Sequence, residues 1–227
     1  MQIKVLRNIL EANHRISDQL RDEFRKQGIL VINLMSSPGA GKTALLEKTL
    51  AQLKGELNMA VIEGDIQTSN DAQRIAATGA QVLQINTEGA CHLDGSMIQE
   101  AMSQMDMASV DILFVENVGN LVCPAEFSVG EDYKVTILSV VEGDDKPEKY
   151  PLMFAESRVL LLNKTDLLPY VDFDTERASD FARAVNKDIY IYPVSAKTGE
   201  GLEEWHDWLR REAALKKQNA QSLNTRT

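Results

Sequence analysis

The sequence predicts an α/β fold of three layers, in which a mostly parallel sheet is flanked by helices. Seven short apolar runs recur along the 227 residues, and helical or polar segments separate most of them. Strands buried on both faces read as continuous apolar runs, and their alternation with helices is typical of βαβ units. The expected strands are ILVINLM (29–35), MAVIE (59–63), QVLQI (81–85), DILFVEN (111–117), KVTILSVV (134–141), RVLLLN (158–163) and IYIYPV (189–194).

An amphipathic helix is expected in front of the first strand. Apolar residues stand at mostly helical spacing over residues 1–27, and the pattern ends near Gly28. This apolar stripe suits packing on the protein's own domain or docking of a partner, and the spacing does not decide between them. The residues of the stripe are Leu6, Ile9, Leu10, Ile16, Leu20 and Phe24.

Composition argues against several kinds of protein. The formal net charge of −10 disfavours a surface for nucleic acid or for an anionic membrane. Two cysteines are too few for a disulfide framework, which indicates a reducing compartment. The first residues do not resemble a secretion signal, and no apolar run approaches the roughly 18–20 residues that span a bilayer. We therefore expect a cytoplasmic protein with no nucleic-acid partner and no membrane association.

The segment SSPGAGKT (36–43) predicts a phosphate-binding loop. It follows the first strand, opens a helix near Thr43, and matches GxxxxGK(S/T) except that Ser36 replaces the first glycine. Glycines let backbone N–H groups point at phosphate oxygens, and the helix N-terminus adds its dipole. Lys42 should reach the β and γ phosphates, and the Thr43 hydroxyl should bind Mg²⁺. A glycine-rich connecting turn is the alternative. The residues expected to contact the nucleotide here are Pro38, Gly39, Ala40, Gly41, Lys42, Thr43 and Ala44.

Two carboxylates are expected beside that loop. Glu116 ends the strand at 111–117, and Asp65 comes just past the second strand. Each suits an Mg²⁺ site, directly or through water, and Asp65 could instead orient the attacking water. The Gly119 N–H should sense the γ-phosphate. With Lys42, these two acids are the expected catalytic residues, and the alternative for each acid is a solvated loop position.

Two later segments predict guanine as the base. In NKTD (163–166), the Asp166 carboxylate can accept from guanine N1–H and from the exocyclic amine, a donor pair that adenine lacks. Asn163 can bridge the loop and the purine N7, while the Lys164 stem packs on the ring. The segment SAK, comprising Ser195, Ala196 and Lys197, should offer a backbone N–H to guanine O6. GTP and GDP are therefore the expected nucleotides.

A second metal site is suggested by the hexapeptide GACHLD (89–94). Cys91 and His92 lie between the third expected strand and a helix that should start near Asp94, where an irregular turn can direct both side chains at one ion. The remaining cysteine, Cys123, follows Glu116 by seven residues. Thiolate and imidazole suit Zn²⁺ and also Ni²⁺. Inert buried cysteines beside a surface histidine, or a Cys91–Cys123 disulfide, remain alternatives from the residues alone.

Taken together, these motifs resemble the HypB family, the nickel-incorporation GTPases of hydrogenase maturation within the SIMIBI class of P-loop proteins. The resemblance covers residues 28–210 and rests on seven segments in the family's order. They are GAGKT, EGDIQTSNDAQR, GACHLDG, ENVGNLVCP, EGDDKPEKYP, NKTDLLP and VSAKTGEG.

The resemblance implies slow Mg²⁺-dependent hydrolysis of GTP and a homodimer linked to nucleotide and metal. It also implies nickel handling with a HypA-type chaperone, for which the N-terminal helix is a candidate docking element, and delivery to a hydrogenase large subunit precursor. In the family the residues matching Cys91, His92 and Cys123 form a metal site at the dimer interface. The family's Cys-x-x-Cys-Gly-Cys motif and its His-rich tract are not found in these residues. Only the site within the GTPase domain is therefore expected here.

The expected organisation is an N-terminal helix (1–27), a GTPase domain (28–215) and a polar, frayed tail (216–227). His14 and His206 are expected to be solvated. We also expect Mg²⁺-GTP to order the loop after Glu116, move Cys123 and so change the affinity of the second metal site.

Three other functions compete with the leading one. In a urease-type accessory GTPase the metal cysteine occurs as Cys-Pro-His, whereas Cys123-Pro124 is followed here by Ala125. A metal-storage protein would bind nickel without releasing phosphate from GTP. A guanine-gated assembly factor would bind no metal.

Overall fold

A parallel sheet forms the centre of the computed structural model, which describes residues 2–65 and 70–224, with only the backbone for residues 2–9 and 224. Within those residues seven strands pair in the order β3-β2-β4-β1-β5-β6-β7, and every pairing is parallel. The expected α/β class and all the expected strands are confirmed. The strands are β1 (Leu30–Ser36), β2 (Met59–Asp65), β3 (Gln81–Asn86), β4 (Ile112–Glu116), β5 (Tyr133–Ser139), β6 (Ser157–Asn163) and β7 (Tyr190–Pro193).

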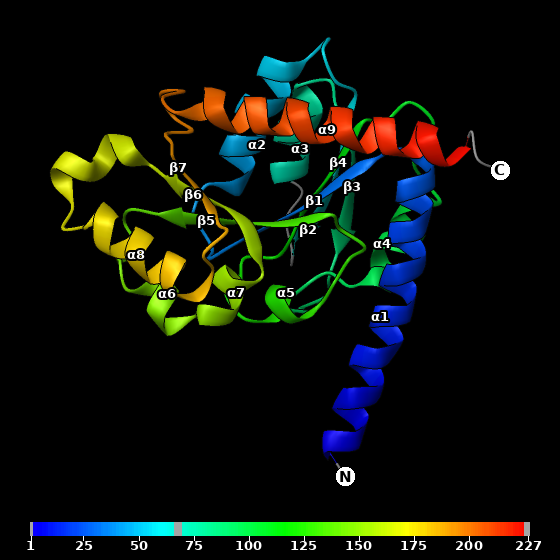
Figure 1. Cartoon of the computed structure of the whole chain (residues 1–227), viewed down its shortest axis with the longest axis horizontal. Coiled ribbons are helices and arrows are strands. Elements are labelled where there is room, and N and C mark those ends of the chain that lie inside the picture. The colour runs from blue at the N-terminus through cyan, green and yellow to red at the C-terminus, as the bar shows by residue number, and fades with distance from the viewer. Residues whose placement is uncertain (1, 66–69, 225–227) are drawn as a thin grey trace.

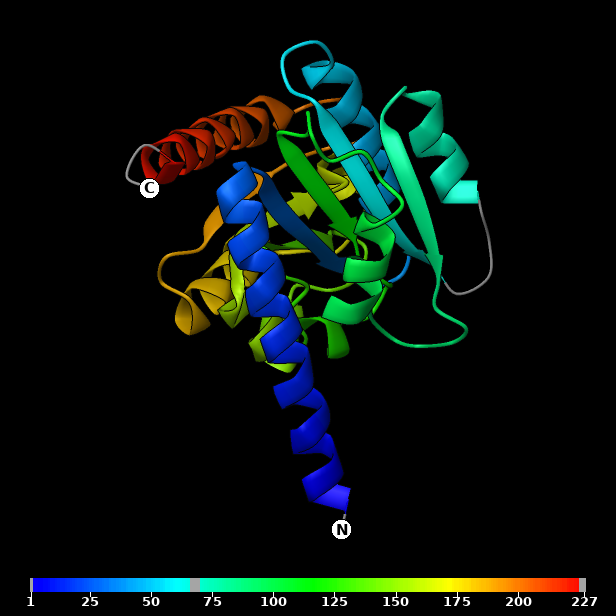
Figure 2. The ribbon, with the colours of Figure 1, turned by 90° about the vertical axis from the view of Figure 1, so that its right-hand side faces the viewer.

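Helices cover both faces of this sheet (Figures 1 and 2). Successive side chains of a strand point to opposite faces, so β1 contributes to two cores at once. Leu30, Ile32 and Leu34 pack under α2 and α9, whereas Val31 packs under α1 and α4. The helices are α1 (Gln2–Gln27), α2 (Lys42–Leu53), α3 (Asn70–Ala77), α4 (Gly95–Met102), α5 (Cys123–Glu126), α6 (Lys146–Lys149), α7 (Pro151–Ala155), α8 (Thr175–Val185) and α9 (Leu202–Asn224), with a 3₁₀ turn η1 (Thr165–Tyr170).

The N-terminal helix α1 ends at Gln27, before Gly28 in the left-handed conformation, as the sequence predicts. Its second half packs on α4 and α9, and Leu20 and Phe24 are fully buried there. The first half projects away from the sheet (Figures 1 and 2). Packing on the protein's own domain is therefore confirmed for the second half of the helix only.

The C-terminal segment differs from the prediction of a frayed tail. Helix α9 continues to Asn224, and Ala220 is buried against Gly28 at the end of α1. Lys217 forms an ion pair with Asp111, 2.6 Å away at the start of β4. These contacts with residues remote in the sequence hold the polar segment as a helix. The prediction of a frayed tail was therefore wrong for residues 216–224. Residues 225–227 lie outside the described part.

The two histidines on helices have different environments. His14 is exposed, as predicted, but His206 is only 3% exposed and neither ring nitrogen has a hydrogen-bond partner. The prediction for His206 was wrong because α9 lies along the sheet with Trp205 and Trp208 buried beneath it, and His206 is enclosed with them.

Among the helices that the structure describes, none combines the length and the apolar character that crossing a bilayer requires.

Burial of His206 predicts a pH-dependent stability. Burial lowers the pKa of His206 below its ordinary 6.5, so the unfolded chain takes up a proton more readily than the folded one. The stabilising contribution is complete above about pH 6.5 and is lost as the pH falls below it. When the pH is lowered from about 7.5 to about 5.5, the free energy of unfolding should therefore fall less in His206→Gln than in the wild type. Urea unfolding at the two pH values measures this difference.

The exposed His14 supplies the matched control. His14→Gln should keep the wild-type pH dependence, and a His206→Gln curve parallel to the wild type would contradict the assignment.

Candidate functional site

The phosphate loop joins β1 to α2 and has the backbone that the motif requires. Gly39 and Gly41 have φ angles of 77° and 101°, which favour glycine. A Cβ on Gly41 would lie 2.6 Å from Asn163 Nδ2, so this position also lacks space for a side chain. Ser36, at the place of the usual first glycine, is not among the residues of positive φ. It ends β1 as buried extended chain, and the substitution is tolerated for that reason.

Lys42 opens α2 with its ammonium group turned into the loop. Its Nζ donates to Ser36 Oγ at 2.9 Å, and Ser36 Oγ donates to the Ser37 carbonyl. Burial lowers the pKa of Lys42, while the nearby acids Glu116 and Asp71 act in the opposite direction. A half-buried cation with surrounding acids suits the binding of a phosphate together with a divalent cation.

The expected acids meet at the carboxyl ends of adjacent strands. Glu116 is 4% exposed, and its Oε1 accepts a 2.8 Å hydrogen bond from Thr43 Oγ1, while Oε2 has no partner. Burial raises the pKa of Glu116, against the opposing effect of Lys42. Asp65 ends β2 and lines the same cavity of about 230 Å³ as Glu116 and Lys42. The sheet therefore brings together the three residues proposed for Mg²⁺, namely Thr43, Asp65 and Glu116.

Glu63 is a residue of this cavity that the sequence analysis missed. It pairs in register with Glu116 across β2 and β4, is 2% exposed, and its Oε2 has no hydrogen-bond partner. Burial and the neighbouring Glu116 raise the pKa of Glu63 to about 8. Its signal in the sequence is a glutamate inside an apolar strand, two residues before Asp65. The carboxylate oxygens of Glu63 and Glu116 that lack a partner fit a divalent cation, which these two residues and Thr43 could hold.

The base-recognition segments are tied to the phosphate loop by Asn163 and Lys164. Asn163 Nδ2 donates to the Ala40 carbonyl at 2.9 Å, and its Oδ1 accepts from the Ala196 N–H at 3.0 Å. Lys164, in a left-handed conformation, donates to the Gly39 carbonyl at 2.7 Å. Three segments remote in the sequence thus meet beside α2.

Asp166 lies where both base-recognition segments meet. Ser195 Oγ donates to Asp166 Oδ1 at 2.7 Å, and Lys197 Nζ lies 3.9 Å from Oδ2. Because the Ala196 N–H is directed at Asn163, the expected backbone contact to guanine O6 stays a prediction.

Cys91, His92 and Cys123 converge on one point. Cys91 Sγ lies 2.8 Å from Cys123 Sγ and 3.4 Å from His92 Nδ1, and all three ligand atoms lie within 4.8 Å of one another. Both cysteines are free thiols, and the three residues are half-buried. Among the described residues this is the one His, Cys, Asp and Glu group with such geometry. The donor set fits a soft divalent cation such as Ni²⁺ or Zn²⁺.

Local structure holds these three side chains in place. Cys91 and His92 lie in the turn before α4, whose N-cap Asp94 accepts from the Ser96 and Met97 N–H groups. The His92 ring stacks on Phe127 with centroids 3.8 Å apart, and burial lowers the pKa of His92. Burial and the adjacent Cys91 raise the pKa of the Cys123 thiol to about 11. A metal must therefore displace the thiol proton when it binds.

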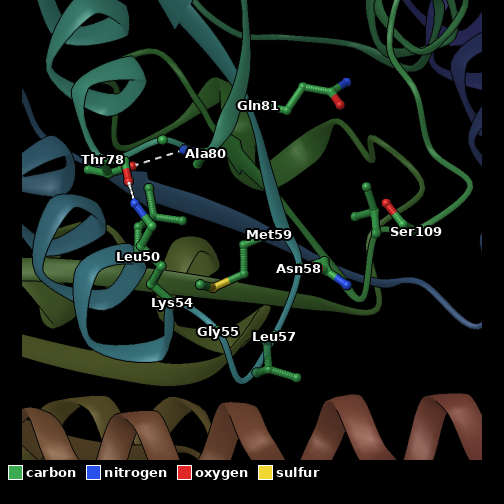
Figure 3. Close-up of a pocket in the computed structure, with 12 residues that line it drawn as sticks. Leu50, Lys54, Gly55, Leu57, Asn58, Met59, Thr78, Ala80, Gln81 and Ser109 are labelled. Atoms are coloured by element: carbon green, nitrogen blue, oxygen red, sulfur yellow. Dashed lines mark hydrogen bonds between the residues drawn. The ribbon is translucent and has the colours of Figure 1, made fainter.

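Another pocket, drawn in Figure 3, lies at the opposite end of the strands. Residues at the end of α2 and at the starts of β2 and β3 line it, including Lys54, Met59 and Gln81. Lys54 Nζ already donates to the Thr78 carbonyl there. Ligands of open parallel sheets bind at the carboxyl ends of the strands, so this pocket is separate from the site described above.

Comparisons with known proteins identify the family to which the chain is similar. The family described as CobW/HypB/UreG, nucleotide-binding domain, matches residues 30–193. The hydrogenase maturation factor HypB of Escherichia coli (strain K12) is 52% identical over 202 residues, which cover 89% of this chain and 70% of that protein.

Two crystal structures share the fold closely. HypB from Helicobacter pylori in complex with nickel has a TM-score of 0.85 and 35% identity, covering 89% of this chain and 95% of that one. HypB from Archaeoglobus fulgidus has a TM-score of 0.84 and 35% identity, covering 89% and 99%.

The two glycines of the phosphate loop with left-handed backbone can be tested by substitution with alanine. Gly41→Ala combines an unfavourable φ with a contact at 2.6 Å, whereas Gly39→Ala meets nothing within 4 Å. We expect Gly39→Ala to cost about 1 kcal/mol of unfolding free energy. Gly41→Ala should cost clearly more and should break the Asn163 contact. Equal losses in urea unfolding of the nucleotide-free variants would contradict this account.

Proposed function

Because this chain belongs to the CobW/HypB/UreG family and is 52% identical to a hydrogenase maturation factor HypB, we propose that it is a GTP-hydrolysing nickel chaperone of hydrogenase maturation. One observation carries the proposal. Glu116, beside the phosphate loop, and Cys123, in the Cys-His-Cys group, stand at the two ends of one short loop.

The nucleotide half of the proposal rests on Asp166 and the phosphate loop. Asp166 lies where the two base-recognition segments meet, joined by its hydrogen bond from Ser195. Its two carboxylate oxygens are the acceptors that the two guanine donors require. Contacts to phosphate are assigned to the loop residues 38–44 and to the Gly119 N–H. We assign Asn163, Lys164, Ser195, Ala196 and Lys197 to the support of the base site.

The hydrolytic half rests on Lys42, Asp65 and Glu116. Bound Mg²⁺ would neutralise charge that develops on the phosphate oxygens. Lys42 is turned into the same loop and adds a positive charge there. Thr43 and Glu116 would hold the cation, and Asp65, which lines the same cavity as Glu116, would either complete the Mg²⁺ ligands or orient the attacking water.

Nickel is the cargo of the proposed chaperone, and Cys91, His92 and Cys123 would bind it. Three ligands leave a coordination position that water or a second subunit can fill, which agrees with a homodimer. The nickel complex of the Helicobacter pylori relative supports Ni²⁺, and the same donors also accept Zn²⁺.

The proposed partners follow from the family. They are a second copy of this chain, a HypA-type nickel chaperone and a hydrogenase large subunit precursor, in the cytoplasm. Helix α1 is the proposed docking element for the chaperone, because its first half extends beyond the sheet. The division into an N-terminal helix (1–27) and a GTPase domain (28–215) also stays a proposal, whereas residues 216–224 belong to helix α9.

The decisive experiment measures both activities on one sample. We expect Mg²⁺-dependent release of phosphate from GTP, and binding of Ni²⁺ by equilibrium dialysis. The variant carrying Cys91→Ala and Cys123→Ala should lose Ni²⁺ binding while it keeps GTP hydrolysis. Nickel binding without phosphate release would indicate a storage protein, and unchanged nickel stoichiometry in the variant would refute the metal site.

Base specificity gives a separate prediction. Asp166→Asn should weaken GDP binding by about a hundredfold or more, because an amide cannot accept from both guanine donors. Xanthosine diphosphate, whose ring carries an oxygen in place of the amine, should bind the variant better than GDP. Isothermal titration checks both, with the wild type preferring GDP as the control. Unchanged GDP affinity would mean that Asp166 does not face the base.

A further inference from the structure

The nucleotide site and the Cys-His-Cys group are separate clusters, and buried contacts within one subunit join them. The geometry points to Asn117 and Leu93 as the contact through which the bound nucleotide, GTP or GDP, changes the position of the metal ligands. This inference rests on the proposed function. Asn117 is a positioning residue in this role, since it acts through the backbone of other residues.

Asn117 stands between the two sites in both sequence and space. It follows Glu116 directly, is 0% exposed, and its Oδ1 accepts from the Leu93 N–H at 2.9 Å and the Val118 N–H at 3.0 Å. Its Nδ2 donates to Asn33 Oδ1 of β1 at 3.1 Å. Leu93 is the residue after His92. The Asn117 side chain therefore connects two positions. One directly follows Glu116, a candidate Mg²⁺ ligand, and the other directly follows His92, a candidate nickel ligand.

The Leu93 side chain makes a second connection to the nucleotide site. It is 0% exposed and lies on Gly64, where a Cβ would be only 2.7–2.9 Å from three of its carbon atoms. Gly64 stands between Glu63 and Asp65 at the end of β2. Leu93 is thus fixed to two strands of the nucleotide site, by its N–H to the residue after β4 and by its side chain to β2.

A second asparagine, Asn120 of the same loop, holds the backbone at Cys123 in a similar way. Asn120 Oδ1 accepts from the Val122 N–H at 2.7 Å and from the Cys123 N–H at 3.2 Å. At its other end, Gly119 lies so close to the phosphate loop that a Cβ would be 3.0 Å from Pro38. A phosphate that displaces Pro38 or Gly119 therefore shifts the backbone that carries Cys123.

Burial makes the Asn117 connection stiff. A buried N–H that loses its acceptor is costly, because no water replaces the lost hydrogen bond. A shift of Asn117 therefore moves Leu93 with it, and Cys91 and His92 follow through two peptide bonds. Nucleotide-dependent movement at Glu116 and Gly119 is thereby converted into a change of metal-ligand geometry.

The chain offers a matched control in Asn13 of α1. Asn13 is 6% exposed, its Oδ1 accepts from the Gly95 N–H at 2.8 Å, and its Nδ2 donates to the Ser128 carbonyl at 2.9 Å. It holds the first residue of α4, two residues after Leu93, through the same kind of hydrogen bond from a backbone N–H to an asparagine Oδ1. Gly95 and Ser128 both lie outside the nucleotide cavity.

The experiment measures nickel affinity with saturating Mg²⁺ and either GDP or a non-hydrolysable GTP analogue, by competition of Ni²⁺ with a chromophoric chelator. In the wild type the two affinities should differ by about fivefold or more. In Asn117→Ala the ratio should fall to less than about twofold. In Asn13→Ala the ratio should stay at the wild-type value, even where the absolute affinity drops. A purely structural role of Asn117 would lower both affinities and keep the ratio.

A measurement on the unmodified protein covers the case in which Asn117→Ala does not fold. The exchange rate of the Leu93 amide hydrogen, followed by NMR, should differ by about fivefold or more between the two nucleotides. A wild-type ratio retained by Asn117→Ala, or an exchange rate insensitive to nucleotide, would overturn the inference and leave the proposed function standing. A wild type that binds no Ni²⁺ or no guanine nucleotide would overturn the proposed function, and the inference with it.

Discussion

The parallel pairing of β4 between β1 and β2 is the constraint on which both sites depend. In a parallel sheet the carboxyl ends of neighbouring strands lie at one edge, so loops that are far apart in the chain start side by side. The phosphate loop leaves β1, the strand end at Asp65 belongs to β2, and the loop to Cys123 leaves β4. The hydrogen bond from Thr43 to Glu116 closes this arrangement by joining α2 to β4.

The nucleotide cavity is built at a cost to the stability of the free protein. Glu63 and Glu116 lie side by side in the register, both are buried, and each has one carboxylate oxygen without a partner. Buried acids without full hydrogen bonding destabilise a fold, unless a bound cation neutralises them. Sites that violate packing rules in this way are typical of places where a ligand binds.

Asparagine side chains organise much of the remaining geometry. Asn163 joins the phosphate loop to the base segment, Asn117 joins β4 to the metal-bearing turn, and Asn120 supports Cys123. A primary amide can donate and accept at once, so buried Asn163 and Asn117 each join two segments of the chain without adding charge. The rigid parts of the nucleotide site and the turn that carries Cys91 and His92 are thereby held by the same kind of contact.

The sequence by itself determined the strands, the phosphate loop and the guanine motifs, whereas the joint site of Cys91, His92 and Cys123 was expected from the family resemblance and its convergence is seen in the structure. These depend on local signals, which are continuous apolar runs, glycines that require left-handed backbone, and residues placed just after strands. Only the tertiary structure decided the burial of His206, the helical course of residues 216–224, and the places of Glu63 and Asn117. Each of these depends on partners remote in the chain: Asn117 meets Leu93 and Asn33 only because β4 lies beside β1 and the turn after β3 folds over it. Whether a polar side chain is solvated or buried is set by what packs against it, and a single chain read in order does not contain that information.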